Sequence, residues 1–279
     1  MSINPIDLLL WTFRRNEHDV VKLYDTLSPI MEISTGGDML NFGYWDNSTI
    51  HPIDAQKNLC RMVGEIAEIS SASMIADVGS GILGPAKIWN EQYPTLQISA
   101  VNVNFSQLSS VNSGNITKLN STARMLPFTD DSLDCVIALE SAQHFKPIED
   151  FISESYRVLK NNSILTLAIP TATNGSSLSN LGILKFTWSS EQYSIEKITK
   201  ELLQNGFEII ESKDITENVY SPLANYYIDN RQELRKKILT RYPSYVEKIL
   251  FESMKKMKAS SDNHHIGYII LKCKKLPLV

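Results

Sequence analysis

Apolar and polar positions are arranged at helical spacing in the first part of the chain. Apolar side chains recur every three to four residues over residues 6–35, and again over residues 54–69. The pair Gly36-Gly37 interrupts the first of these segments. The pattern therefore predicts two helical segments joined by a loop, and this loop contains the aromatic stretch Asn41-Phe42-Gly43-Tyr44-Trp45.

From residue 73 onward, short apolar runs alternate with amphipathic segments. The runs predict strands at 73–78, 97–103, 134–139, 163–169, 207–212 and 265–272. The segments between them predict helices at 85–93, 107–111, 148–158 and 191–205. Strands that alternate with helices of this length form a parallel sheet with right-handed crossovers, so the fold class is α/β.

The segment between the last two predicted strands is an exception to this alternation. It contains two helical stretches, at 229–242 and 244–258. Together with the N-terminal helices, these stretches are placed to cover a ligand site at the edge of the sheet. The alternative that they only enlarge the hydrophobic core stays open.

Composition places the chain among ordinary globular proteins. Of its 279 residues, 43% are hydrophobic and 21% are charged, which excludes a disordered or fibrous chain. Apolar runs such as Ile164–Ile169 are too short to span a bilayer, and the N-terminus lacks the basic region of a signal peptide. The three cysteines, Cys60, Cys135 and Cys273, form no CxxC pair, so neither a metal nor a disulfide is expected. We expect a cytoplasmic protein without a transmembrane segment.

The net charge of −4 conceals an uneven distribution. Residues 231–279 contain 12 Lys and Arg against 4 Asp and Glu, whereas the rest of the chain carries a net charge of −12. The basic segment is either a solvated helix face or a basic cap that attracts an anionic substrate or an acidic membrane surface. Nucleic acid is not an expected partner, because the whole chain is acidic and no nucleic-acid motif is present.

A glycine-rich loop follows the first predicted strand of the sheet. That strand ends near Asp77, glycines follow at 79, 81 and 84, and a helix begins near Pro85. The glycines permit a tight turn and let a ligand approach the backbone, while the helix N-terminus offers free N–H groups. Such a loop alone is compatible with several nucleotide-type cofactors. The carboxylate of Asp77 would repel a pyrophosphate but suits the cationic amino end of S-adenosylmethionine.

The residues around this loop resemble a known family. Ile75–Gly81 is similar to motif I of the class I S-adenosylmethionine-dependent methyltransferases, and Ser99–Leu108 is similar to their second-strand motif. The resemblance implies that Asn102 stands where an acid usually holds the ribose hydroxyls, with Val103 beside it. It also implies that Gln107 turns toward the ribose.

Two later segments continue the resemblance. Thr122–Phe128 resembles the DAxxLPF segment, in which an acid meets the adenine amino group, and Thr122 replaces that acid. Glu140-Ser141-Ala142-Gln143-His144 resembles the ESxxH segment of a narrower group, which includes tocopherol, sterol, sarcosine/dimethylglycine and natural-product sugar methyltransferases.

The resemblance suggests roles for individual side chains. His144 is either a general base, for which its unperturbed pKa of about 6.5 is suitable, or a residue that only shapes the pocket. Glu140 is expected to contact the cofactor. Tyr24 and Tyr44 either approach the sulfonium or pack in the N-terminal cap. A further set of aromatic residues either lines an apolar acceptor pocket or packs in the core and cap: Trp45, Trp188, Tyr226 and Tyr227.

The resemblance also implies the overall organisation. We expect a Rossmann-like, doubly wound, seven-stranded and mostly parallel sheet with an antiparallel last strand and helical caps. The expected divisions are an N-terminal cap (1–70), a cofactor-binding core (71–220), a helical insertion (221–262) and a final core strand (263–279). The expected cofactor contacts are Tyr24, Tyr44, Asp77, Gly79, Ser80, Gly81, Asn102, Val103, Gln107, Thr122, Ala123, Arg124 and Glu140.

The expected activity is methyl transfer from S-adenosylmethionine to an oxygen or carbon of a small molecule, and a homodimer is compatible with it. Asn102 and Thr122 keep two alternatives open. One is a relative that binds the cofactor but catalyses a non-methylating reaction such as cyclisation. The other is a non-catalytic cofactor-binding module.

Overall fold

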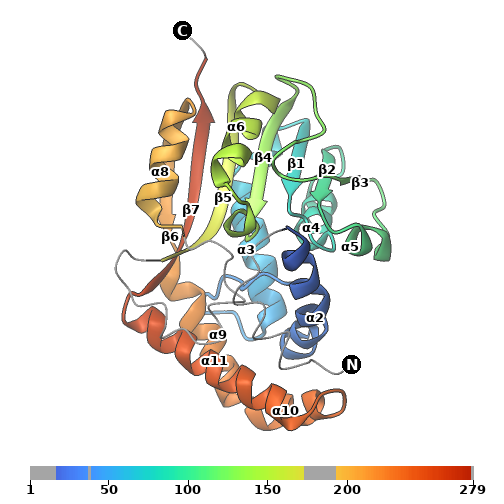
Figure 1. The fold of residues 1–279 in the computed structure, drawn as a ribbon, viewed down its shortest axis with the longest axis vertical. Helices are drawn as coiled ribbons and strands as arrows, with labels where there is room; N and C mark the ends of the chain where they lie inside the picture. The colour runs from blue at the N-terminus through green and yellow to red at the C-terminus, as the bar shows by residue number, and fades with distance from the viewer. Residues whose placement is uncertain (1–16, 37–38, 173–192, 278–279) are drawn as a thin grey trace.

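The central element of the chain is a seven-stranded sheet with the strand order β3-β2-β1-β4-β5-β7-β6 (Figure 1). The computed structural model describes residues 17–36, 39–172 and 193–277. The first five strands pair in parallel, and β7 runs antiparallel to both β5 and β6. The expected Rossmann-like fold with an antiparallel last strand is thus confirmed. The strand bounds are β1 Met74–Val78, β2 Gln97–Asn102, β3 Thr117–Asn120, β4 Leu133–Leu139, β5 Leu159–Ala172, β6 Phe207–Asp214 and β7 Ile266–Lys275.

Helices cover both faces of this sheet, because its central strands are apolar on both sides. On one face, α3 (Pro52–Ile66) and α4 (Gly84–Gln92) pack with Ile75 of β1 in one hydrophobic cluster. On the other face, α6 (Ile148–Val158) and α8 (Ile195–Gln204) pack with the next strand residue, Ala76. The short helix α5 (Phe105–Ser110) follows β2, and its Leu108 joins the first cluster.

The remaining helices gather beyond the end of the sheet to which the β4 arrow points (Figure 1). They are α2 (Glu17–Thr35), α9 (Tyr220–Asp229), α10 (Arg231–Leu239) and α11 (Ser244–Asp262). Their buried side chains, such as Tyr227 and Ile238, belong to the same hydrophobic cluster as α3. These helices therefore enlarge the core and also lie at the carboxyl ends of the parallel strands, where doubly wound sheets bind ligands.

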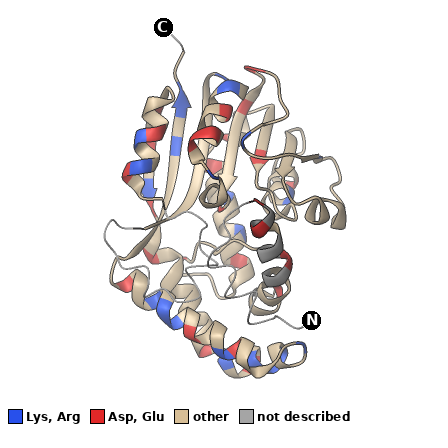
Figure 2. Cartoon of the chain, viewed as in Figure 1, with Lys and Arg blue, Asp and Glu red and all other residues tan. Residues whose placement is uncertain are grey.

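The basic C-terminal segment forms part of this helical group. Acidic residues lie among the more numerous Lys and Arg on α10 and α11 (Figure 2). Lys237 pairs with Glu233, and Lys258 pairs with Asp262. Glu247 of α11 is fully buried and accepts a hydrogen bond of 2.8 Å from Arg231 Nε of α10, so this ion pair joins the two helices. None of the helices described is both long and apolar enough to cross a bilayer.

Three elements differ from those predicted by the sequence. Strand β3 was missed because its residues are mostly exposed and polar, as befits a short strand at the sheet edge. The helix expected at 229–242 corresponds to α10, which spans Arg231–Leu239, whereas the preceding helix α9 was not predicted. The helix expected at 6–35 is described from Glu17 onward, and its first residues lie outside the described ranges.

Candidate functional site

The loop between β1 and α4 has the backbone geometry that the glycines predicted. Gly79 has a φ of +81°, and a Cβ on it would lie 2.2 Å from the Cβ of Ser141. Gly81 has a φ of +53°, and a Cβ on it would meet no atom within 4 Å. Gly79 is therefore required by close packing against the loop after β4, whereas Gly81 borders open space.

A cavity lies above this loop, at the carboxyl ends of β1, β2 and β4. The sequence analysis named thirteen expected cofactor contacts and His144, and ten of these fourteen residues line the cavity. They come from four separate parts of the chain. These are Asp77, Gly79, Ser80, Gly81, Asn102, Val103, Gln107, Ala123, Glu140 and His144. The sheet topology brings these segments together, because β1 is hydrogen-bonded to both β2 and β4.

Charge in the cavity is of one sign. Three carboxyl groups line it, those of Glu17, Asp77 and Glu140, and the described lining residues include neither Lys nor Arg. Such a cavity suits a ligand with a cationic group and lacks the cations that usually hold a phosphate.

Asp77 is the group best suited to a cationic donor. Its side chain is 2% exposed, and burial raises its pKa to about 7. Within the described residues, neither Asp77 Oδ2 nor the hydroxyl of Ser80 has a hydrogen-bond partner. A buried polar atom without a partner costs about 1–3 kcal/mol, so a ligand that donates to Asp77 would relieve this cost. The residues present therefore fit the amino end of S-adenosylmethionine.

Glu140 joins three segments at the end of β4. Its oxygens accept hydrogen bonds from the backbone N–H of Phe42, at 2.9 and 3.0 Å, and from the hydroxyl of Tyr268, at 2.9 Å. Burial raises its pKa to about 8, although these bonds lower it. The carboxyl group thus fixes the aromatic loop of the N-terminal region against the sheet and also lines the cavity.

The loop that Glu140 holds contributes residues that the sequence analysis missed. Met39, Leu40 and Asn41 line the cavity. The buried side chain of Gln56 in α3 positions them, because its Nε2 donates to the carbonyl oxygens of Met39, at 3.0 Å, and of Asn41, at 2.7 Å. A polar residue on the apolar face of a predicted helix was the one available signal of this contact.

His144 lies in a short 3₁₀ helix, η2 (Ala142–His144), immediately after β4. Its side chain is 9% exposed and lines the cavity. Burial lowers its pKa to about 4, so the unperturbed value of about 6.5 used in the sequence analysis does not hold here. The imidazole is neutral at physiological pH and is able to accept a proton, but it is a weak base.

The wall formed by β2 is held by a network of amides. Asn102 Nδ2 donates to the carbonyl oxygen of Gly81, at 3.0 Å, and to Gln107 Oε1, at 2.9 Å. Asn102 Oδ1 accepts from the backbone N–H of Asn104, at 3.1 Å. Asn102 therefore ties the glycine loop to the start of α5.

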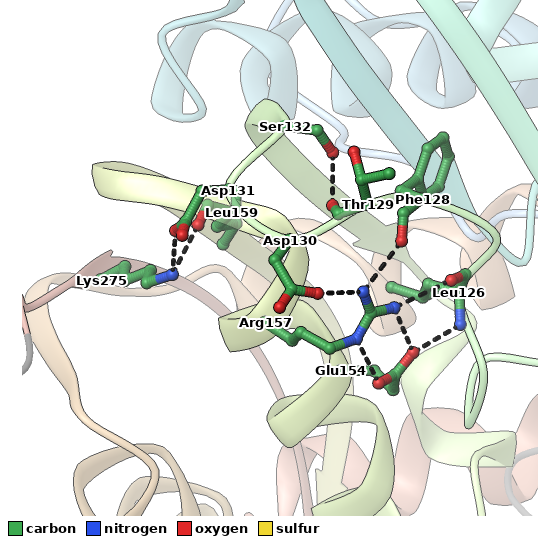
Figure 3. A network of polar contacts seen from close by, with 10 residues as sticks. All are labelled: Leu126, Phe128, Thr129, Asp130, Asp131, Ser132, Glu154, Arg157, Leu159 and Lys275. Carbon is green, nitrogen blue, oxygen red and sulfur yellow. Dashed lines mark hydrogen bonds and ion pairs between the residues drawn. The ribbon is translucent and has the colours of Figure 1, made fainter.

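Side chains of α6 hold the segment after β3 in place through hydrogen bonds. The guanidinium of Arg157 donates to the carbonyl oxygens of Leu126 and Phe128 and pairs with Glu154 and Asp130 (Figure 3). Glu154 also accepts from the backbone N–H of Leu126, at 2.8 Å. These bonds fix the segment that brings Ser121 and Ala123 to the cavity.

Four of the expected contacts are not placed on this cavity. Thr122 is next to the lining and donates from its hydroxyl to Glu17. Arg124 is exposed and lies 3.5 Å from Asp150. Tyr44 is half-buried and packs against the main hydrophobic cluster. Tyr24 is in α2, but its side chain lies outside the described part of the structure.

The aromatic residues suggested for an acceptor pocket mostly pack within the cap. The rings of Trp45 and Tyr226 have centroids 5.7 Å apart, and Tyr227 is buried in the main cluster. Trp45, Tyr226 and Tyr227 are not among the residues that line the cavity. Trp188 lies outside the described residues.

Comparisons with known proteins find a matching domain and similar chains. Residues 76–167 match a family described as a methyltransferase domain. Erythromycin 3''-O-methyltransferase from Saccharopolyspora erythraea is 27% identical over 280 residues, which cover 91% of this chain and 87% of that protein.

Two solved structures share the fold. A mycolic acid cyclopropane synthase complexed with S-adenosylhomocysteine gives a TM-score of 0.75 at 15% identity, covering 90% of this chain and 95% of that chain. The (4+2) cyclase SpnF gives a TM-score of 0.71 at 21% identity, covering 94% of this chain and 96% of that chain.

The family match begins in β1, which carries Asp77, and ends in β5, so it spans the strands that build the cavity. The relative from Saccharopolyspora extends the likeness over most of the remaining chain. The resemblance to the class I S-adenosylmethionine-dependent methyltransferases that was found in the sequence is thereby confirmed.

Proposed function

We propose that this enzyme methylates a hydroxyl group of a small natural-product acceptor. The observation that carries the proposal is the pairing of an acidic cofactor cavity with one neutral histidine, His144, on its wall. The relative that matches 91% of the chain is named as an O-methyltransferase, which supports oxygen over carbon as the acceptor atom.

The cofactor end of the site is assigned to the glycine loop and to Asp77. Asp77 would bind the amino group of S-adenosylmethionine, with Ser80 beside it as a further polar contact. The free N–H groups at the start of α4 would face the carboxylate of the cofactor. Gln107 and the segment at Ala123 would border the adenosine.

The acceptor end of the site is assigned to His144. When it is bound, S-adenosylmethionine supplies a methyl group that is already activated by the positive charge on sulfur. The imidazole of His144 is neutral at physiological pH and would take the proton that the acceptor hydroxyl loses. Apolar neighbours, Leu139 and Phe145, line the same cavity and would exclude water from this step.

The helices beyond the sheet are proposed to act as a cap. The N-terminal region (1–70) and the insertion (221–262) would enclose the acceptor over the core (71–220), which the final strand (263–279) completes. A cytoplasmic location would supply both the cofactor and a reducing environment for the three buried cysteines.

Methyl transfer is tested with radiolabelled S-adenosylmethionine and a panel of hydroxylated natural products with matched O-methylated controls. We expect label in the hydroxylated compounds only, together with stoichiometric release of S-adenosylhomocysteine. Label in a control whose hydroxyl is already methylated would contradict oxygen as the acceptor atom. A new product without S-adenosylhomocysteine release would indicate the non-methylating alternative.

A further inference from the structure

Helix α2 forms one wall of the cofactor cavity. Glu17 and Val21 line the cavity, and Asp25 follows one turn further along the helix. Residues spaced by four lie along the same side of a helix, so Asp25 is on the same side of α2 as Glu17 and Val21, and its side chain is exposed. The N-terminal helix therefore contributes a carboxylate to the cavity.

Two polar contacts attach this side of α2 to the core. The hydroxyl of Thr122 donates to Glu17 Oε1, and Asn104 Nδ2 donates to Asp25 Oδ1 at 3.0 Å. Glu17 lines the cavity, whereas Asp25 is not among its lining residues. Glu17 therefore both attaches α2 to the core and is accessible to a ligand in the cavity. Asp25 only attaches the helix.

The two neutral residues that stand where the resemblance implies an acid, Asn102 and Thr122, already use their hydrogens in hydrogen bonds. Both hydrogens of the Asn102 amide are donated, to Gly81 and Gln107, and its oxygen accepts from Asn104. The hydroxyl hydrogen of Thr122 is donated to Glu17. A carboxylate accepts about four hydrogen bonds, so Glu17 retains most of its capacity for donors from a ligand.

Adenosine presents donors of the matching kind, namely its amino group and its two ribose hydroxyls. We propose that the Glu17 carboxylate binds a donor group of the cofactor's adenosine, so that α2 is part of the cofactor site. This inference rests on S-adenosylmethionine being the cofactor. Glu17 then supplies, from a separate helix, the anionic acceptor that the neutral residues Asn102 and Thr122 do not provide.

The test is calorimetric titration with S-adenosylhomocysteine, which binds without reacting. Glu17→Gln keeps the shape of the side chain and removes its charge, so we expect binding to weaken about tenfold. Asp25→Asn is the matched control, since it neutralises the docking carboxylate that is outside the cavity. We expect this variant to bind as the wild type does. Melting temperatures establish that each variant is folded.

A second substitution tests whether the position of the charge is what matters. Thr122→Asp in the Glu17→Gln background returns a carboxylate next to position 17, because Thr122 contacts Glu17, and we expect it to recover most of the lost affinity. Unchanged binding by Glu17→Gln would overturn the proposal, as would equal losses in Glu17→Gln and Asp25→Asn. The titration needs no acceptor, so a failure to find a methylated product would contradict the proposed function without changing this result.

Discussion

The hydroxyl of Tyr268, in the last strand, donates a 2.9 Å hydrogen bond to the carboxyl group of Glu140 at the end of β4. Because Glu140 also accepts from the backbone of Phe42, the antiparallel strand β7 helps to position a loop that borders the cofactor cavity. Strand β7 thus completes the sheet and also supports the site.

Tyr268→Phe is expected to destabilise the fold. The substitution removes one donor from a buried carboxyl group, which costs about 1–3 kcal/mol. Urea unfolding measures the free energy of unfolding. Tyr156→Phe is the control, because its hydroxyl donates to the carbonyl oxygen of Leu276 at an exposed position. A loss for Tyr268→Phe no larger than that for Tyr156→Phe would contradict the role given to Tyr268.

The same variant has an expected pH dependence. Burial raises the pKa of Glu140 to about 8 in the folded chain, above its value in the unfolded chain, so the folded state holds the extra proton. The contribution to stability is therefore present at low pH and is lost as pH rises toward about 8. Tyr268 lowers this pKa, so its removal should raise the pKa further and extend the loss of stability to pH values above about 8. Unfolding curves between pH 5 and 10 measure the pH at which the free energy of unfolding stops falling.

Cofactor affinity should depend on the ionisation of Asp77. Burial raises the pKa of Asp77 to about 7, and the carboxylate is the form that attracts an ammonium group. Affinity for S-adenosylhomocysteine should therefore rise about tenfold per pH unit below pH 7 and level off above it. Asp77→Asn should bind weakly and remove the part of this dependence that arises near pH 7. Calorimetry at pH 6, 7 and 8 measures both effects.

Glu91→Gln is the control for Asp77, because Glu91 is an exposed carboxylate on α4. We expect it to keep both the affinity and the pH dependence of the wild type. If the pH dependence near pH 7 persists in Asp77→Asn, another group in the cavity is responsible, and Glu140 is the first to examine.

His144→Ala should lower turnover about 10²- to 10⁴-fold and leave the affinity for S-adenosylhomocysteine nearly unchanged. Since burial places the pKa of His144 at about 4, turnover should show no histidine-dependent rise between pH 6 and 8. His265→Ala, in the turn before β7, is the control and should keep full turnover. A wild-type pH profile with a limb near 6.5 that His144→Ala abolishes would show that the imidazole ionises as in water. Unchanged turnover of His144→Ala would exclude it as the base.

Much of the fold was predictable because burial on both faces leaves apolar runs in the strands. The runs at β1 and β4 showed where the sheet lies, and the glycines after β1 marked the cofactor loop. Strand β3 was not predictable, because a polar edge strand lacks this pattern. Helix α9 was not predicted either, and the helix expected from residue 229 included only its last residue.

The site was predictable where its residues are close to a strand end in the sequence, as Asp77 and Glu140 are. Met39 and Glu17 line the cavity because of tertiary contacts of the N-terminal region. Such contacts cannot be predicted from local sequence patterns. The lowered pKa of His144 could not be predicted from the sequence either, because it depends on burial of the side chain by several segments.

Gly79 and Gly81 are expected to respond differently to alanine, although both have positive φ. At Gly79, a Cβ would lie 2.2 Å from the Cβ of Ser141 and 2.8 Å from its hydroxyl oxygen. Gly79→Ala therefore combines backbone strain with a clash against the loop after β4 and should destabilise the fold by more than about 3 kcal/mol. At Gly81, no atom lies within 4 Å of the added methyl group, so only strain of about 1–3 kcal/mol is expected.

The two variants should also differ in cofactor binding. Gly81→Ala should remain folded at 25 °C but lose affinity for S-adenosylhomocysteine, because its methyl group enters the open space that borders the cavity. Urea unfolding and calorimetric titration on the same samples separate stability from binding. Gly114→Ala is the control, since Gly114 also has a positive φ and open surroundings but is not among the cavity-lining residues. If Gly81→Ala and Gly114→Ala bind S-adenosylhomocysteine equally well, the cofactor does not approach the backbone at Gly81.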